Sequence, residues 1–321
     1  MTPIQIKDPE TGSFAKILPE LGFNCFEFQA MVDGQPVDVI DAHPDFASGN
    51  QRPSSGGIPI LFPFPNRIAH GQFQWDGVTY ELPADKTYYD KTGNAIHGFC
   101  LDLPWRVISQ EESSVTGQFQ LSIDGKHRLQ YWPGDIFIEV RYEVKGTALR
   151  AEIRVGNPGT TSIPWGLGTH PYFKVPLSQN SEKKHCLVEA PASEEWVLEN
   201  CVPVGVKKSI GKSHDLREGI WLDQLQADDI LTGMPEETDQ YECLIMDEKA
   251  GLVVTQDYDA IFSELVVFTP PDRDCVCLEP YTCVTNAINL LSADVETGLR
   301  VLPPESEIKT WIEIRAGKVL V

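Results

Sequence analysis

The sequence predicts an all-β fold, a large antiparallel sandwich or barrel, with residues 1–321 in a single domain. Three observations lead to this prediction. Short segments of alternating apolar and polar residues recur along the chain, turns rich in glycine and proline separate them, and helical periodicity is scarce. All-β domains can reach this length as one unit. Because no linker, internal repeat or low-complexity tract interrupts the chain, we expect one domain.

The first third of the chain contains two expected hairpins. Residues 25–32 alternate as a strand does, and residues 33–40 read as a turn and a second strand. The second hairpin, residues 72–82, has its turn at Asp76-Gly77. Between the hairpins, residues 54–66 hold two glycines and three prolines around an apolar core, which excludes a regular helix or a central strand.

The most regular alternation lies between Ile136 and Val155. Apolar residues recur at every second position on both sides of a turn, which predicts an antiparallel hairpin with one wet face. The best helix candidate is the segment 220–231, in which Trp221, Leu225 and Ile230 would point inward. Further strands are expected at residues 252–255, 264–268, 275–279 and 310–316.

Charge and hydropathy narrow the class of partner. The formal net charge of -21 repels phosphate groups, so nucleic acid and anionic membranes are poor partners and a neutral small molecule fits better. No apolar run approaches the roughly 18 residues that a membrane helix needs. The N-terminus lacks the basic and apolar regions of a secretory signal. We therefore expect a cytoplasmic protein, either a monomer or a homodimer, that binds neither nucleic acid nor membranes.

The cysteines and the missing fingerprints argue against a metal or a cofactor. The eight cysteines form no dense regular framework, which favours reduced thiols over disulfides. Cys275, Cys277 and Cys283 cluster, but no second pair follows at zinc-ligand spacing, so we expect small buried apolar side chains and no metal site. The fingerprints G-x-G-x-x-G, the P-loop, G-x-S-x-G and H-E-x-x-H are absent, and no cofactor is expected.

A histidine among glycines and aromatic residues is the first candidate for a functional residue. His170 lies in the segment WGLGTHPYF, residues 165–173, where Pro171 favours an extended backbone and a fixed direction for the imidazole. The two glycines allow a ligand to approach closely, and the three aromatic rings offer flat apolar faces beside a sugar. The segment by itself is equally consistent with a structural histidine in an aromatic cluster.

Glu279 is the second candidate, because an acid at the end of an apolar strand is unusual. It follows Leu278 and precedes Pro280, so its backbone is extended and directed in the same way as that of His170. A glutamate there is either paired structurally or held as a base whose pKa burial raises. A glutamate and a histidine that face one pocket can move two protons on a small neutral molecule.

Three further positions are weaker candidates. Arg67 follows the proline-rich segment and can hold hydroxyl groups with its planar set of donors, or it can be an ordinary surface arginine. His97 precedes a glycine, as a histidine at the lip of a cavity would, although a lone loop histidine usually has no role. Asp228 and Asp229 are adjacent, so that one can point into a cavity while the other caps a turn or faces water, although the pattern alone favours two solvated acids.

Five segments together resemble the aldose 1-epimerases, also known as galactose mutarotases. The resemblance runs from about Gly56 to the final strands, and the HGF, HPYF and LEP signatures are specific in combination. The matching segments are Asn66-Arg67-Ile68 after a GGIP-ILFP loop, Ile96-His97-Gly98-Phe99, Thr169 to Phe173, the pair Asp228-Asp229, and Leu278-Glu279-Pro280 with a downstream Asn286.

The resemblance implies a large antiparallel β-sandwich, galactose mutarotase-like, that interconverts the anomers of a free aldohexose. Glu279 would be the general base that takes the anomeric proton, and His170 the general acid that protonates the ring oxygen. His97 and Arg67 would bind and orient the sugar, and Asp228 would hold its hydroxyl groups. A protonated His170 beside an ionised Glu279, which unperturbed pKa values of ~6.5 and ~4.3 permit in part, predicts an optimum near neutral pH.

Two departures from the family leave the sugar open. Asp229 stands where many relatives carry a histidine, and Tyr281-Thr282-Cys283 follows the LEP motif where the galactose enzymes carry a glutamine. A hexose-6-phosphate 1-epimerase is an alternative and would need a cationic cluster, for which Arg52, Arg67 and Lys174 are possible members. A carbohydrate-binding protein without catalysis is a second alternative, which the intact pair of His170 and Glu279 argues against.

Overall fold

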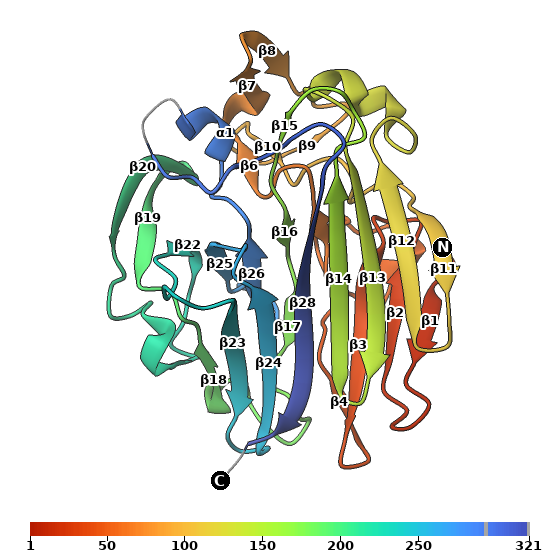
Figure 1. Cartoon of the computed structure of the whole chain (residues 1–321). Coiled ribbons are helices and arrows are strands. Elements are labelled where there is room, and N and C mark those ends of the chain that lie inside the picture. Colours follow the sequence, from red (N-terminus) through yellow and green to blue (C-terminus); the bar gives the residue numbers. More distant parts are fainter. Residues whose placement is uncertain (292–294, 320–321) are drawn as a thin grey trace.

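Strands make up almost the whole architecture (Figure 1). The computed structural model describes residues 1–291 and 295–319. Two large antiparallel sheets dominate, and smaller sheets and loops cover their ends. The only α-helix among these residues is the short α1 (Ala287–Leu290). The prediction of an all-β antiparallel sandwich is therefore confirmed.

The larger sheet has nine strands and runs from the middle of the chain to its C-terminal part. In spatial order the strands are β11 (Arg106–Gln110), β12 (Ser114–Gln120), β13 (Phe137–Lys145), β14 (Ala148–Gly156), β28 (Glu307–Lys318), β24 (Leu252–Asp259), β23 (Gln240–Asp247), β18 (Cys186–Glu189) and β21 (Ile220–Trp221). The expected hairpin of residues 136–155 is present in this sheet as β13 and β14, and β14 pairs with β28, the last strand of the chain.

The second sheet has eight strands and carries the candidate site. One of these eight, β17 (Tyr172–Lys174), lies off the main path and pairs with β26. Along the path the strands are β20 (Val202–Ser209), β19 (Glu194–Glu199), β22 (Asp228–Thr232), β25 (Glu264–Phe268), β26 (Cys275–Tyr281), β16 (Gly168–Thr169) and β5 (Ile60–Leu61).

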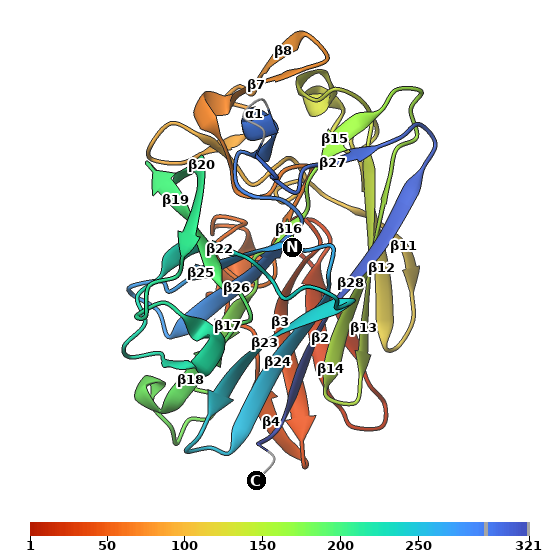
Figure 2. The same ribbon diagram turned by 60° about the vertical axis from the view of Figure 1, so that its left-hand side comes forward.

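Smaller sheets complete the structure. The hairpin of β7 and β8 lies at the end opposite to β4 in both ribbon views (Figure 2). These strands are β1 (Ile4–Lys7), β2 (Phe14–Leu18), β3 (Asn24–Val32) and β4 (Gln35–Asp38); β6 (Arg67–Ile68), β9 (Tyr88–Tyr89) and β10 (Ala95–Ile96); β15 (Ile163–Trp165) and β27 (Arg300–Leu302); and β7 (Gln72–Trp75) and β8 (Val78–Glu81). Short 3-10 helices span Phe46–Ser48, Ala69–Gly71, Lys126–Tyr131, Lys183–His185 and Leu216–Glu218.

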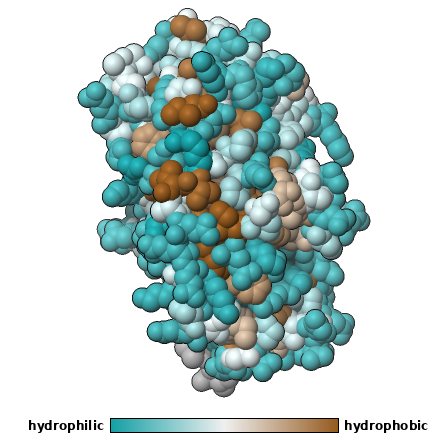
Figure 3. Space-filling model, turned by 90° about the vertical axis from the view of Figure 1, so that its right-hand side faces the viewer, coloured by the Kyte–Doolittle hydropathy of each residue, from teal (hydrophilic) through white to brown (hydrophobic). Residues whose placement is uncertain are grey.

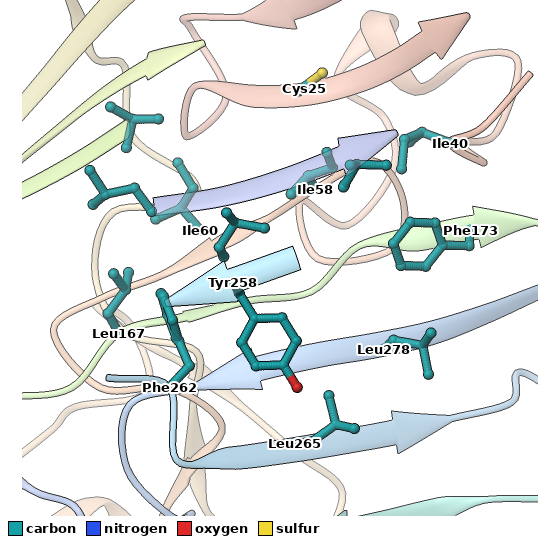
Figure 4. Close-up of a cluster of buried hydrophobic side chains, with 14 of the residues drawn as sticks. Cys25, Ile40, Ile58, Ile60, Leu167, Phe173, Tyr258, Phe262, Leu265 and Leu278 are labelled. Carbon is teal, nitrogen blue, oxygen red and sulfur yellow. The ribbon is translucent and has the colours of Figure 1, made fainter. Parts of the chain in front are cut away.

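The main hydrophobic core lies between the two large sheets, so that one face of the eight-stranded sheet packs against this core and its other face points away from it (Figure 4). Leu278 of β26 and Leu265 of β25 point toward Tyr258 of β24 in the nine-stranded sheet, and all three are buried (Figure 4). Because successive residues of a strand point to opposite sides, the neighbours of Leu278 point away from this core. Glu279 is one of these neighbours, so the sandwich core itself determines which way the candidate base points.

The expectation of a helix at residues 220–231 is wrong. The segment forms β21 at its start and the first residues of β22 at its end. β22 pairs with β19 on one side and β25 on the other, and these long-range hydrogen bonds outweigh a weak helical periodicity. Leu225 and Ile230 are buried as expected, whereas Trp221 is only partly buried.

The other expected elements are present within a few residues of their predicted limits. Both early hairpins form, and residues 54–66 are irregular apart from the two-residue edge strand β5. Several strands, among them β18, β19, β20 and β23, lack a clear alternation and were not expected. The eight cysteines are free thiols, and Cys275, Cys277 and Cys283 are buried as predicted.

The surface is mainly polar, with scattered apolar side chains. Figure 3 shows the face on the β11 side of the molecule, where brown apolar groups interrupt a teal surface. Val107 and Ile108 of β11 are among the exposed apolar residues. Within residues 1–291 and 295–319, no helix has the length and apolar content needed to cross a membrane.

We predict that Gly98→Ala destabilises the protein more than Gly77→Ala does. Both glycines have a positive φ, 75° and 77°, which costs a residue with a Cβ about 1–3 kcal/mol. A Cβ on Gly98 would also collide with the backbone of Phe62, whereas a Cβ on Gly77 meets nothing within 4 Å. Urea unfolding of the two variants measures the difference, and equal losses would contradict the packing argument.

Candidate active site

The pairing of strands gathers the candidate residues on one face of the eight-stranded sheet. Tyr172 of β17 pairs with Cys277 of β26, and Gly168 of β16 pairs with Tyr281 of β26. Cys277, Glu279 and Tyr281 are alternate residues of β26 and therefore point to the same side. His170 lies in the connection between β16 and β17, within reach of Glu279 on that side.

His170 and Glu279 are in direct contact. His170 Nε2 lies 3.3 Å from Glu279 Oε1, and the side chains are only 8% and 2% exposed. The ring of His170 stacks on Tyr172 with 4.6 Å between ring centroids, and its backbone N–H donates to the carbonyl of Pro59. These contacts fix the imidazole, so the two predicted catalytic residues form one preorganised pair.

Tyr281 holds the other oxygen of Glu279. Its hydroxyl group donates a hydrogen bond of 2.5 Å to Glu279 Oε2. This contact was not predicted from the sequence, in which Tyr281 stands out only as a departure from the family pattern. The alternation of side chains along a strand could have predicted it, because Tyr281 is two positions after Glu279 and therefore points to the same face.

Burial drives both members of the pair toward their neutral forms. It raises the pKa of Glu279 well above the ordinary value, although the Tyr281 hydroxyl group opposes this rise. Burial also lowers the pKa of His170 to about 3, and the positive charge of Arg273 adds to this effect. Burial thus favours a neutral pair, with a proton on Glu279 and none on His170, whereas the reaction that the resemblance implies uses a protonated His170 beside an ionised Glu279.

His97 lies beside His170. Their rings meet edge to face with 5.8 Å between centroids, and His97 is buried with a φ of 71°. Its backbone N–H donates to the carbonyl of Asn66. Burial lowers the pKa of His97 well below its usual value, and the nearby positive charges of Arg52 and Arg67 lower it further. Burial thus favours the neutral imidazole of His97, and the structure places its ring next to His170.

Arg67 is held at the margin of the site by a carboxylate and by the backbone. Its Nε lies 2.6 Å from Asp90 Oδ2, and its Nη1 donates to Asn66 Oδ1. The backbone N–H of Asn286 donates to the carbonyl of Arg67, which connects two segments of the family resemblance. The charge of Arg67 opposes the rise in the pKa of Glu279, so the guanidinium acts on the pair electrostatically.

The register of β22 shows which of the two adjacent acids faces the site. Asp228 pairs with Phe268, which in turn pairs with Cys277, so Asp228 lies on the face of Glu279. Asp229 lies on the opposite face, where its Oδ2 is 2.6 Å from His214 Nδ1. The negative charge of Asp228 raises the pKa of Glu279 further. The structure thus brings together all five predicted site residues, His170, Glu279, His97, Arg67 and Asp228.

Within the part of the chain that the structure describes, two groups of residues have donor atoms that could hold a metal ion. One consists of His170, Cys277 and Glu279, whose ligand atoms lie within 4.8 Å of one another. The other consists of Glu195, His214 and Asp229, on the far side of β22. In the sequence Cys277 is grouped only with the neighbouring cysteines, because His170 lies more than a hundred residues away.

Solved structures share this fold. A galactose mutarotase-like protein from Clostridium acetobutylicum matches with a TM-score of 0.83 and 23% identity, over 96% of this chain and 93% of that one. A GalM/aldose epimerase homologue from Caenorhabditis elegans matches with a TM-score of 0.79 and 19% identity, over 99% of both chains. The architecture is therefore that of the galactose mutarotase-like proteins.

The chain belongs to the aldose 1-epimerase family, whose model matches residues 31–315. One relative is the uncharacterized protein YihR of Escherichia coli strain K12, which is 27% identical to this chain over 237 residues. That alignment covers 72% of this chain and 71% of YihR. The match includes the segments that carry the five candidate site residues, since all of them lie between residues 31 and 315.

We predict that the imidazole of His170 stays neutral from pH 8 down to pH 5. Its pKa is lowered to about 3, so protonation begins only when the pH falls far below the ordinary range of histidine. Long-range ¹H–¹⁵N NMR of the ring nitrogens, with His170→Asn to assign the signal, measures this directly. An imidazolium signal from His170 at pH 7 would contradict the assignment of the proton to Glu279.

Proposed function

We propose that the protein is an aldose 1-epimerase that interconverts the α and β anomers of a free aldohexose. The observation that carries this proposal is the buried contact of 3.3 Å between His170 Nε2 and Glu279 Oε1. Such a pair can give one proton and take another in the same step, and each group is worth about 10²–10⁴ in rate. Membership of the aldose 1-epimerase family supports the same reaction.

In the proposed reaction, the single proton of the pair moves from Glu279 to His170 when a sugar binds. The hydroxyl groups of the sugar make the pocket more polar, which lowers the free energy of the charged tautomer. Glu279 then takes the proton of the anomeric hydroxyl group, while His170 protonates the ring oxygen and the bond between C1 and that oxygen breaks. Rotation about C1–C2 and the reverse proton transfers close the ring as the other anomer.

The remaining candidate residues would bind and orient the sugar. His97 lies next to His170, where its neutral imidazole can donate or accept a hydrogen bond near the ring oxygen. Arg67 and Asp228 lie close enough to Glu279 to alter its pKa and offer a donor and an acceptor for sugar hydroxyl groups. Tyr281 keeps Glu279 directed toward the pocket through its hydrogen bond.

Glu279→Gln and His170→Asn should each reduce catalysis by about 10²–10⁴-fold, because each removes one of the two proton-transfer groups. The measurement is polarimetry of freshly dissolved α-D-glucose and α-D-galactose with catalytic amounts of protein. The ratio of the two wild-type rates would indicate sugar preference. A folded wild-type protein that accelerates neither sugar would overturn the free-aldose proposal.

Tyr281→Phe should shift the basic limb of the pH–rate profile to higher pH by about one unit and lower the plateau by about tenfold. The pair keeps its proton until the pH rises through the raised pKa of Glu279, and loss of the Tyr281 donor raises that pKa further. The same loss makes the charged tautomer rarer, which lowers the plateau. If the plateau falls but the basic limb of the pH–rate profile stays at the same pH, Tyr281 contributes only packing and does not affect the pKa of Glu279.

Asp228→Asn should raise KM about tenfold, while Asp229→Asn should leave KM within a factor of two. The two residues are adjacent and chemically identical, but only Asp228 lies on the face of Glu279. Steady-state rates with the preferred sugar, together with thermal unfolding of both variants, make the comparison. A larger KM effect for Asp229 would mean that the other face of β22 contacts the sugar.

The charges around the site favour a free sugar over a sugar phosphate. Of the three cations considered for phosphate, Arg67 is paired with Asp90, and Lys174 is half exposed and paired with Asp38. Arg52 stacks over Tyr88 with 5.1 Å between its Cζ and the ring centroid. Polarimetry of glucose 6-phosphate beside glucose distinguishes the two substrates, and a protein that binds sugar without accelerating mutarotation would be a carbohydrate-binding protein.

A further inference from the structure

The site contains a thiol that the proposed sugar chemistry does not use. Cys277 is fully buried on β26, two residues before Glu279 and on the same face. Its sulfur lies within 4.8 Å of both His170 Nε2 or Nδ1 and a carboxylate oxygen of Glu279. An imidazole nitrogen, a sulfur and a carboxylate oxygen converge here from two segments that are more than a hundred residues apart in sequence.

We propose that His170, Cys277 and Glu279 form a binding site for a thiophilic divalent metal ion, Zn²⁺ above all, and that the bound ion excludes the sugar. Cysteine, histidine and glutamate are the side chains that bind Zn²⁺ in proteins, and a site with three protein ligands leaves a fourth position for water. Binding of the ion does not depend on the proposed mutarotase function, although the inhibition that follows from it does.

The distances suit a tetrahedral ion. With metal–ligand bonds of about 2.0 Å, two ligand atoms of a tetrahedral zinc site lie about 3.3 Å apart. The separation of His170 Nε2 and Glu279 Oε1 is 3.3 Å. A thiolate bond of about 2.3 Å places sulfur about 3.5 Å from the other ligands, so the sulfur of Cys277, which lies within 4.8 Å of them, has to approach by about 1.3 Å at most. Its single side-chain torsion allows a movement of that size.

The surrounding contacts leave the required atoms available. Tyr281 occupies Oε2 of Glu279, and Oε1 is the oxygen that faces His170. Stacking on Tyr172 holds the ring of His170 in place. A hydrogen-bonded carboxylate and a fixed imidazole are the arrangement that supports metal ligands in proteins. On binding, the Cys277 thiol and the protonated Glu279–His170 pair each release a proton to the solvent.

The ion and the sugar would compete for the same atoms. A metal at this position occupies His170 Nε2 and Glu279 Oε1, which are the two atoms that the proposed reaction needs for proton transfer. The second group of possible ligands, Glu195, His214 and Asp229, contains no sulfur. In that group Glu195 is paired with Lys208 and Asp229 with His214. A sulfur-specific measurement therefore separates the two groups.

The test is a titration of the metal-free protein with Co²⁺, followed by absorbance in the region of thiolate-to-cobalt charge transfer. We expect the band to saturate near one equivalent in the wild type, to be displaced by Zn²⁺, and to disappear in Cys277→Ser. Cys275→Ser is the matched control, because Cys275 is buried on the same strand and face but lies outside the group. Cys275→Ser should keep the band.

Zn²⁺ inhibition supplies the second readout. Relative to each protein's own rate without metal, the apparent inhibition constant should rise about tenfold or more in Cys277→Ser and stay unchanged in Cys275→Ser. Thermal unfolding checks both variants, and Cys277→Ala replaces a serine variant that does not fold. A wild type without the cobalt band, or a band that persists in Cys277→Ser, would overturn the proposal. A cobalt band in a protein without mutarotase activity would support the metal site and refute only the proposed function.

Discussion

The arrangement of the site depends on one contact, the buried approach of His170 to Glu279. Burial in this pocket disfavours the charged form of each group, and one shared proton would leave both neutral together. The sandwich enforces their meeting, since Leu278 points into the core beside Glu279 and β17 pairs with β26 next to His170. The stability of the sheet and the chemistry of the pocket thus rest on the same strand register.

The proton between these residues has two possible positions, and burial selects the uncharged one. The proposed reaction uses the charged tautomer, so a bound sugar would have to make that tautomer accessible. Three neighbours change the pKa of Glu279. The hydroxyl group of Tyr281 and the charge of Arg67 favour the ionised carboxylate, whereas the negative charge of Asp228 opposes ionisation. The protonation of the pocket therefore depends on these neighbours as well as on the two residues that we propose transfer protons.

Local sequence was sufficient for the parts of the site that depend on backbone direction. The His-Pro and Glu-Pro pairs indicated directed side chains, and alternation predicted the hairpins and the all-β class. Long-range pairing could not be read in the same way, because β22 is a strand only through its hydrogen bonds to β19 and β25. A strand assignment there would have separated Asp228 from Asp229 by alternation alone, and the same rule would have revealed Tyr281.

The central claim is that His170 and Glu279 exchange protons with a sugar catalytically. Two-dimensional exchange NMR of an equilibrated aldohexose tests it most directly, because the anomers interconvert without net change and simple binding cannot accelerate their exchange. The account predicts strong exchange cross-peaks between the α and β anomeric protons with catalytic wild-type protein and their loss with folded Glu279→Gln. Cross-peaks that persist in Glu279→Gln, or that are absent with wild type for every aldohexose tested, would contradict it.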